Sequence, residues 1–263
     1  MIRRREFLLS AAAGGILSGA RPITASPVYA FQTPEPKSIH TWLESPEPNI
    51  YAYDVDVRIN DFPANADRKW LYYFSLQVNF TGHKGWSHGG IQWAGVREFN
   101  ESNNLGVNWG GGSDWAGYGG IGVNNIPYRW EKGKWYRYRA WRLKKEADGL
   151  WRWLFAMFDY SYGKEQQFGT VRTKSEHIKS AVVFTETGYG VACVTPRTDV
   201  EWRNPRYRTP AGIFVPTKGT ATYNGTCTGR SNTQQGLVSK DPLQWFHSTG
   251  TRRTVAYNDR LWG

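Results

Sequence analysis

Residues 82–141 contain so much glycine and tryptophan that this stretch is not expected to form helix. Glycine loses more backbone freedom on folding than any other residue, so glycines at this density favour turns and close backbone approaches. Each tryptophan adds a large ring and an indole N–H that needs a partner when buried. Rings carried on glycine-rich loops suit a sugar, which presents C–H faces and hydroxyl edges. The alternative, that the rings fill the core of an aromatic-rich β protein, stays open.

Two stretches alternate with a period of two residues, which is typical of β-strands with one face in the core. In residues 51–59 the apolar side chains share one parity, and Asp54, Asp56 and Arg58 share the other. We expect this second face to be wet. In residues 72–80 every second side chain from Tyr72 onward is apolar, and the side chains between them, from Tyr73 to Asn79, are mostly polar. No window of the chain shows a helical period.

Turn signals separate further short strands, including a hairpin at Ala147-Asp148-Gly149 between strands predicted over 135–143 and 150–160. Residues 181–185 and 200–203 have the composition of further strands. Many short strands of this kind predict a single antiparallel β-sandwich over residues 31–263, of jelly-roll, concanavalin-like type, with long Gly/Trp-rich loops. Within it, residues 210–263 are expected to be a loop-rich C-terminal extension.

The N-terminus has the pattern of an export signal over residues 1–30. Arg4-Arg5 precedes a short apolar run, as in twin-arginine signals, and Val28-Tyr29-Ala30 is an acceptable cleavage site. A basic general secretory signal is the alternative. The apolar run is too short to span a membrane, which needs about 20 residues. The sequence therefore predicts an extracytoplasmic protein, secreted or associated with the cell wall, without a membrane span.

Charge and cysteine content narrow the choice of partner. Residues 1–30 carry four arginines and one glutamate, so their removal lowers the net charge from +11 to +8. A basic exported protein favours anionic surfaces such as acidic polysaccharides, and export argues against nucleic acid. Cys193 and Cys227 are the only cysteines, and in an oxidising compartment they predict one disulfide. The oligomeric state is not predicted.

Several motifs resemble a secreted bacterial family of unknown function, the 3472 family. They are Tyr72-Tyr73-Phe74-Ser75-Leu76-Gln77-Val78, Gly89-Gly90-Ile91-Gln92-Trp93 and Tyr128-Arg129-Trp130-Glu131-Lys132-Gly133-Lys134-Trp135-Tyr136. The later Asp199-Val200-Glu201-Trp202-Arg203-Asn204-Pro205 is similar to a closing strand of concanavalin-like sandwiches. The resemblance covers roughly residues 51–207. It implies a lectin/glucanase-like sandwich in a polysaccharide-rich setting and assigns no catalytic residues.

Catalysis is left undecided by the sequence. Glycoside hydrolysis needs two facing carboxyl groups, and Asp54 with Asp56 is the one tight acidic pair on a well-defined strand. Solvated strand-face carboxylates are the alternative explanation for this pair. Polysaccharide lyases need a Tyr or His base with Arg or Gln beside the uronate. The residues that provide such a set are His83, His88, Gln77, Gln92, Arg137, Arg139, Tyr160 and Tyr162, and Asp114 is a further acidic candidate.

The expected function is carbohydrate engagement, with binding preferred over hydrolase or lyase action on an acidic glycan. The predicted ligand-binding residues are Trp86, Trp93, Trp109, Trp115, Gln92, Arg137 and Arg139, with the two arginines on the same sheet face as the rings. Packing of Arg on Trp without a ligand is the alternative. A metal site is a weaker alternative, since His83 and His88 give two ligands in a loop, Asp114 is the one candidate for a third, and a zinc site needs at least three. We therefore expect no metal and no cofactor, and the sequence has no pattern that would place a structural calcium ion.

Overall fold

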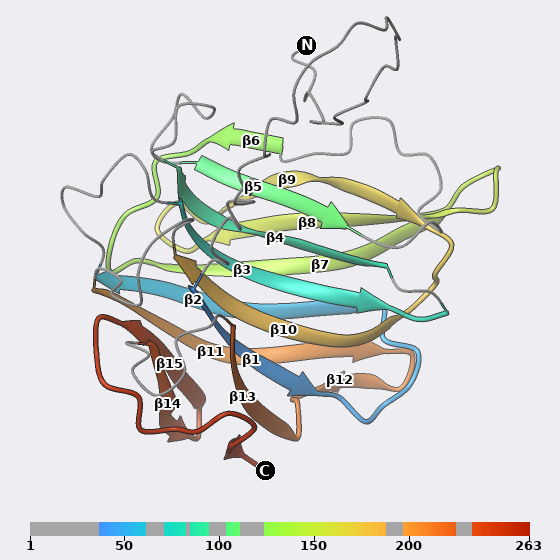
Figure 1. The fold of residues 1–263 in the computed structure, drawn as a ribbon. Helices are drawn as coiled ribbons and strands as arrows, with labels where there is room; N and C mark the ends of the chain where they lie inside the picture. Colours follow the sequence, from blue (N-terminus) through green and yellow to red (C-terminus); the bar gives the residue numbers. More distant parts are fainter. Residues whose placement is uncertain are drawn as a thin grey trace, which may run out of the picture. The chain divides into compact units, whose positions relative to one another are not determined.

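The computed structural model describes residues 37–61, 71–82, 85–94, 104–110, 124–187, 197–224 and 233–263. For residues 37, 71, 94, 104–110, 124–127 and 224 it describes the backbone alone. The described chain contains strands and turns, without helix, and its strands form two antiparallel sheets packed face to face (Figure 1). The predicted all-β sandwich is confirmed. The predicted export signal, residues 1–30, lies outside the described residues.

Sheet A contains eight of the described strands, in the order β16-β13-β1-β10-β3-β4-β5-β6. Its centre joins strands that are far apart in the sequence, since β1 pairs with both β10 and β13. Pairing of strands distant in sequence is a feature of β-sandwiches with Greek-key connections, to which jelly rolls belong. The bounds are β1 Lys37–Glu44, β3 Leu71–Phe80, β4 Trp86–Ala94, β5 Asn104–Gly110, β6 Asn124–Pro127, β10 Ile178–Thr187, β13 Lys218–Asn224 and β16 Arg260–Trp262.

Sheet B has the order β14-β15-β11-β2-β7-β8-β9 within the described residues, and the short β12 pairs with β11 outside this path. The predicted hairpin at Gly149 is confirmed as the turn between β7 and β8, and Gly149 has a φ of 86°. The bounds are β2 Ala52–Asp61, β7 Trp135–Lys145, β8 Trp151–Asp159, β9 Lys164–Thr173, β11 Thr198–Thr209, β12 Gly212–Phe214, β14 Thr233–Lys240 and β15 Leu243–Thr249.

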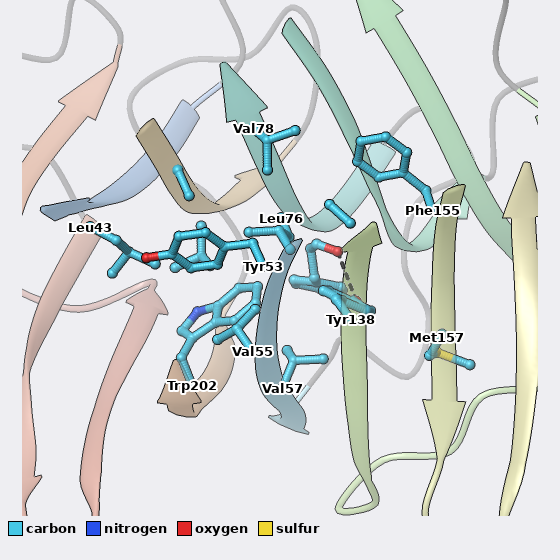
Figure 2. Close-up of a cluster of buried hydrophobic side chains, with 14 of the residues drawn as sticks. Leu43, Tyr53, Val55, Val57, Leu76, Val78, Tyr138, Phe155, Met157 and Trp202 are labelled. Atoms are coloured by element: carbon cyan, nitrogen blue, oxygen red, sulfur yellow. Dashed lines mark hydrogen bonds between the residues drawn. The ribbon is translucent and has the colours of Figure 1, made fainter. Parts of the chain in front are cut away.

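The core lies between the two sheets and contains the alternating apolar side chains that the sequence predicted to be buried. Val55 and Val57 of β2 face Leu76 and Val78 of β3, and all four are at most 1 % exposed (Figure 2). Branched and aromatic side chains fit a pleated surface that is buried on one side. Burial of each such side chain stabilises the fold by about 1.5–3 kcal/mol.

Tyr138 of β7 ties the two sheets together at the centre of the core. Its hydroxyl donates to the carbonyl oxygen of Phe74 at 2.8 Å and accepts from the backbone N–H of Ile91 at 2.9 Å. Phe74 and Ile91 belong to β3 and β4, in the opposite sheet. Burial raises the pKa of Tyr138 well above its ordinary value, so the phenol stays a neutral donor.

The C-terminal residues are an integral part of the sandwich, so the prediction of a loop-rich extension over 210–263 is wrong. Strands β12 to β16 all lie in this part of the chain, and they contribute to both sheets. The alternation of apolar and polar residues is hard to recognise in these strands, because some of their buried residues are polar and form hydrogen bonds. Gln235 and His247 are fully buried and contact Thr41 Oγ1 at 2.7 and 2.8 Å. A hydropathy pattern cannot distinguish such residues from loop residues.

Part of the Gly/Trp-rich stretch forms strand where the sequence predicted loop. Trp86 begins β4, and Gly89 and Gly90 lie within it. The reason for Gly90 is a close backbone approach, since a Cβ at this position would lie 1.9 Å from the carbonyl oxygen of Phe74. Glycine inside a strand often marks such an approach, which composition alone does not separate from a loop.

Candidate functional site

The outer face of sheet B buries the two aspartates that the sequence placed on a wet face. Asp54 and Asp56 are 2 % and 1 % exposed. Asp56 accepts from Arg137 Nε at 2.7 Å and from Asn204 Nδ2 at 3.0 Å. Asp54 lies 3.8 Å from Arg139 Nε. Arginines from the neighbouring strands therefore take the place of water, and the prediction of a wet face is wrong.

Aromatic rings complete this layer of charges. The guanidinium carbon of Arg203 lies 3.7 Å from the ring centre of Trp135, and that of Arg137 lies 5.4 Å from the ring centre of Tyr160. The Tyr160 hydroxyl donates to Asp56 at 3.1 Å. Burial raises the pKa of the Asp54 carboxyl even though Arg139, Arg208 and Arg137 oppose that shift. The arginines and carboxylates of this face are thus ion-paired within the chain, although Asp54 Oδ1 and Nε of Arg139, Arg203 and Arg208 are buried without a hydrogen bond among the described residues.

The predicted grouping of Arg137 and Arg139 with the tryptophans on one sheet face is therefore wrong. The two arginines lie on β7 in sheet B, whereas Trp86, Trp93 and Gln92 lie on β4 in sheet A. Their guanidinium groups already pair with Asp56, Asp54 and Glu165. The residues predicted for a lyase site are also divided between the two sheets, because His88 is on sheet A and Tyr160 follows β8 of sheet B.

The outer face of sheet A brings together aromatic, amide and titratable side chains from β1, β10, β3 and β4. Cross-strand pairing sets their rows: Trp42, Val182, Gln77 and His88 form one row, and Ser38, Glu186, Tyr73 and Gln92 form another. Residues directly opposite each other in a sheet point to the same side. We call this group of eight residues, with Trp86 and Asn79 in the neighbouring row, the outer-face cluster.

The tryptophans of the sequence prediction divide between the two sides of sheet A. Trp86 is half-buried in the outer-face cluster, and its ring centre lies 5.0 Å from that of His88. Trp93 has the opposite parity and meets the core residue Tyr72 edge to face at 6.1 Å. Trp109 is on β5, opposite Ser87 of β4, and only the backbone of β5 is described. His83, Asp114 and Trp115 lie outside the described residues, as do Cys193 and Cys227.

Amide side chains run along the outer face of sheet A between its tryptophans. Gln77 Nε2 donates to Asn79 Oδ1 at 3.0 Å, and Asn79 Nδ2 donates to Ser180 Oγ at 3.0 Å. This chain of hydrogen bonds fixes the orientation of both amides. Trp42 is 38 % exposed, and its indole N–H donates to Thr222 Oγ1 at 3.0 Å, so this ring is also held in place.

Titratable groups in the outer-face cluster have strongly altered pKa values. Burial raises the pKa of the Glu186 carboxyl from 4.5 to about 7. Burial lowers the pKa of His88 to about 3, and neither of its ring nitrogens has a hydrogen-bond partner in the described part of the chain. Glu186 makes no ion pair there either. Perturbed groups gathered at one place are a physical mark of functional sites.

The sequence reasoning missed Trp42, Tyr73 and Glu186. Tyr73 could have been found, because it shares the polar parity of the strand with Gln77 and Asn79. Trp42 follows the same rule, since it alternates with the buried Thr41 and Leu43 in β1. Glu186 lies at the end of a short predicted strand, and only the pairing of β10 with β3 places it beside Tyr73.

Across the ranges described, no three His, Cys, Asp or Glu side chains are grouped so as to hold a metal ion. The same ranges contain no helix that is long and apolar enough to cross a membrane.

Comparison with known proteins supports the fold alone. No protein-family model and no curated protein sequence matches the chain. Two solved structures of scytalido-glutamic peptidase, one with a transition-state analogue inhibitor and one with a peptide-based analogue, superimpose with TM-scores of 0.53 and 0.50 at 7 % and 8 % sequence identity. Each covers 82 % of this chain and 99 % of the peptidase. The peptidase SCP-B, of the eqolisin family, has a TM-score of 0.47 at 7 % identity over 83 % of this chain and all of its own.

Proposed function

We propose that this protein acts outside the cytoplasm and binds an extracellular or cell-wall polysaccharide on the outer face of sheet A. The observation that carries this proposal is the pair of tryptophans, Trp42 and Trp86, at either side of an oriented row of amides. The export pattern of residues 1–30 and the resemblance to the 3472 family belong to the same proposal.

The spacing of the cluster suits a sugar polymer. Trp42 is on β1 and Trp86 is on β4, so three strand spacings, about 14 Å, separate them across the sheet. Rings at this distance accommodate separate units of one chain. Gln77 and Asn79 lie between them with fixed amides, which meet hydroxyl groups as donors or acceptors. A few placed polar groups among rings are what small-molecule and sugar sites share.

The contrast with sheet B supports the choice of face. On sheet B the arginines and carboxylates pair with one another, so a ligand would have to break those contacts. On sheet A the half-buried carboxyl of Glu186 has no ion pair among the described residues. Polar groups without protein partners gain the most from a ligand, because an unpaired buried group carries a desolvation cost.

The test measures binding and stability on single alanine variants. Trp42→Ala and Trp86→Ala are expected to weaken polysaccharide binding by about 1–3 kcal/mol, the scale of a lost aromatic contact, with little change in Tm. Trp141→Ala, a half-buried tryptophan on the outer face of sheet B, is the matched control and should leave binding unchanged. Unchanged binding in both sheet A variants on a full glycan panel would contradict the proposal.

Hydrolysis is a second candidate, and the raised pKa of Glu186 favours it. A carboxyl with a pKa near 7 is suited to general acid–base catalysis at neutral pH. Gln92 lies two strands away in the same row, with Tyr73 between them. Because the superimposed structures are named as peptidases, peptides should be tested as substrates alongside polysaccharides. Glu186→Gln should abolish turnover and retain binding, as followed by product analysis; turnover by this variant would exclude the carboxyl as catalyst.

A further inference from the structure

A pocket separate from the outer-face cluster lies where the open edges of the two sheets meet. Its volume is about 340 Å³, and it is lined by Tyr128, Arg129, Tyr162, Lys164, Glu165 and Gln166. Tyr128 directly follows β6 at the edge of sheet A, while Lys164 begins β9 at the edge of sheet B (Figure 1). We propose that this edge pocket binds one anionic sugar unit, a hexuronate, of the polysaccharide.

One buried carboxylate holds both aromatic walls of the edge pocket. Asp159, 2 % exposed, accepts from the Tyr128 hydroxyl at 2.5 Å through one oxygen. Its other oxygen accepts from the backbone N–H groups of Ser161 and Tyr162 at 2.7 and 3.4 Å. Burial and the bond to Asp159 raise the pKa of Tyr128, so this phenol remains a donor to Asp159. Its hydroxyl is therefore engaged. The ring is partly buried against the core, and its exposed part lines the pocket, where it can contact a pyranose.

The charge of the edge pocket is positive. Glu165 is its one acidic lining residue, and Arg139, which is not part of the lining, pairs with it at 2.5 Å. Arg129 and Lys164 have no carboxylate partner among the described residues. Two uncompensated cations therefore face a ligand in this pocket. A guanidinium binds a carboxylate in bidentate fashion, and a lysine adds a point charge.

Both the volume and the lining residues of the edge pocket suit a single hexuronate unit. Ligand pockets span about 300–1,000 Å³, and this one is at the small end, which suits a single ring rather than an oligomer. The Tyr128 ring offers a stacking face, Arg129 and Lys164 offer charge for a carboxylate, and Gln166 offers an amide for a hydroxyl. A uronate carboxylate can pair with these two exposed cations and a neutral sugar cannot, so we expect the pocket to prefer the acidic unit.

The test uses the secreted protein with digalacturonate as the probe and the neutral digalactoside as its match, in calorimetric titrations. Wild type should bind the uronate and not the neutral sugar. The Arg129→Gln/Lys164→Gln double variant should lose affinity for the uronate at least tenfold. An Arg252→Gln/Lys179→Gln double variant, which removes the same charge at exposed positions away from the pocket, should bind like wild type.

This inference rests on the proposed function for its ligand class, and its failure can be distinguished from failure of that function. Trp42→Ala and Trp86→Ala should leave digalacturonate binding intact while weakening the longer polymer. Loss of digalacturonate binding in those variants, with none in the edge-pocket variant, would place the uronate on sheet A and overturn the pocket. Equal losses in both double variants, or full displacement by free sulfate, would show only general attraction of anions and would also overturn it.

Discussion

Arg137 Nε donates to Asp56 Oδ1 at 2.7 Å across neighbouring strands of sheet B. Asp56 is 1 % exposed, and it also accepts hydrogen bonds from Asn204 Nδ2 and the Tyr160 hydroxyl. Arg203 Nε forms an ion pair with it at 3.5 Å. The arginine that the sequence offered to a ligand carboxylate thus already holds a carboxylate of its own chain. The arginines at the centre of this face are therefore engaged in ion pairs within the chain, and the binding that we propose uses the outer face of sheet A and the edge pocket instead.

Removal of Asp56 is expected to destabilise the fold. Asp56→Ala leaves Arg137 and Arg203 without their buried partner, and breaking such a group costs about 3–5 kcal/mol. Urea or thermal unfolding monitored by tryptophan fluorescence measures the change. Asp61→Asn, in the exposed pair with Lys132 at 3.9 Å, should change the free energy of unfolding by less than about 1 kcal/mol. Equal effects of the two variants would refute a structural role for Asp56.

Tyr138→Phe tests the connection between the sheets. The change keeps the ring and deletes the hydroxyl that bridges Phe74 and Ile91, so two buried backbone groups lose a partner. Such groups cost about 1–3 kcal/mol when unsatisfied, and we expect a loss of that size in the free energy of unfolding. Tyr257→Phe, at a position that is 60 % exposed, is the control and should have no measurable effect. A neutral result for Tyr138→Phe would mean that water or a rearrangement replaces the hydroxyl.

The parts of the fold that follow from alternation could be predicted from the sequence. The strands around Val55 and Leu76 and the turn at Gly149 have patterns that depend only on neighbouring residues. The C-terminal strands could not be found in this way, because Gln235 and His247 are polar and still fully buried. Their partner Thr41 is 194 residues away from Gln235 and 206 residues away from His247, and only the folded topology brings it near.

The candidate site was predicted in part, for a related reason. His88, Gln92 and Trp86 have the same parity, and they do share one face of β4. Trp93 has the other parity and lies against the core, as its odd separation from Trp86 indicates. Which sheet each strand joins is decided by long-range pairing, so the sequence could not separate the arginines of β7 from the rings of β4.

The predicted disulfide gains a geometric argument from the described strands. Cys193 follows β10, and Cys227 follows β13, and these strands flank β1 with their ends near Lys37 and Ser38. The C-terminal ends of β10 and β13 therefore lie at the same end of sheet A. In the chain-entropy model, a bridge that closes the loop from Cys193 to Cys227 would stabilise the folded protein by about 3.5–4 kcal/mol. Mass spectrometry of the secreted protein should show one Cys193–Cys227 bond, and two free thiols would exclude it.

The outer-face cluster should make stability depend on pH through Glu186. Because burial raises its pKa in the folded state to about 7 from 4.5, the folded protein keeps this proton after the unfolded chain has lost it. The contribution is therefore fully present below pH 4.5 and is lost as the pH rises through about 7. Solvent reaches the half-buried side chain, so we expect the loss to be less than about 3 kcal/mol.

Glu186→Gln isolates this contribution, since the amide has the same shape and does not titrate. Burial lowers the pKa of His40 to about 4 and that of His88 to about 3, which gives stability the opposite slope below pH 6.5. These histidines are unchanged in the variant, so they cancel in the difference between the two proteins. Thermal melts from pH 4 to pH 8 should show equal Tm values at the acidic end and an increasingly stable variant above pH 5. A constant difference across that range would mean that the Glu186 carboxyl ionises normally, and the case for it as an acid–base catalyst would then be lost.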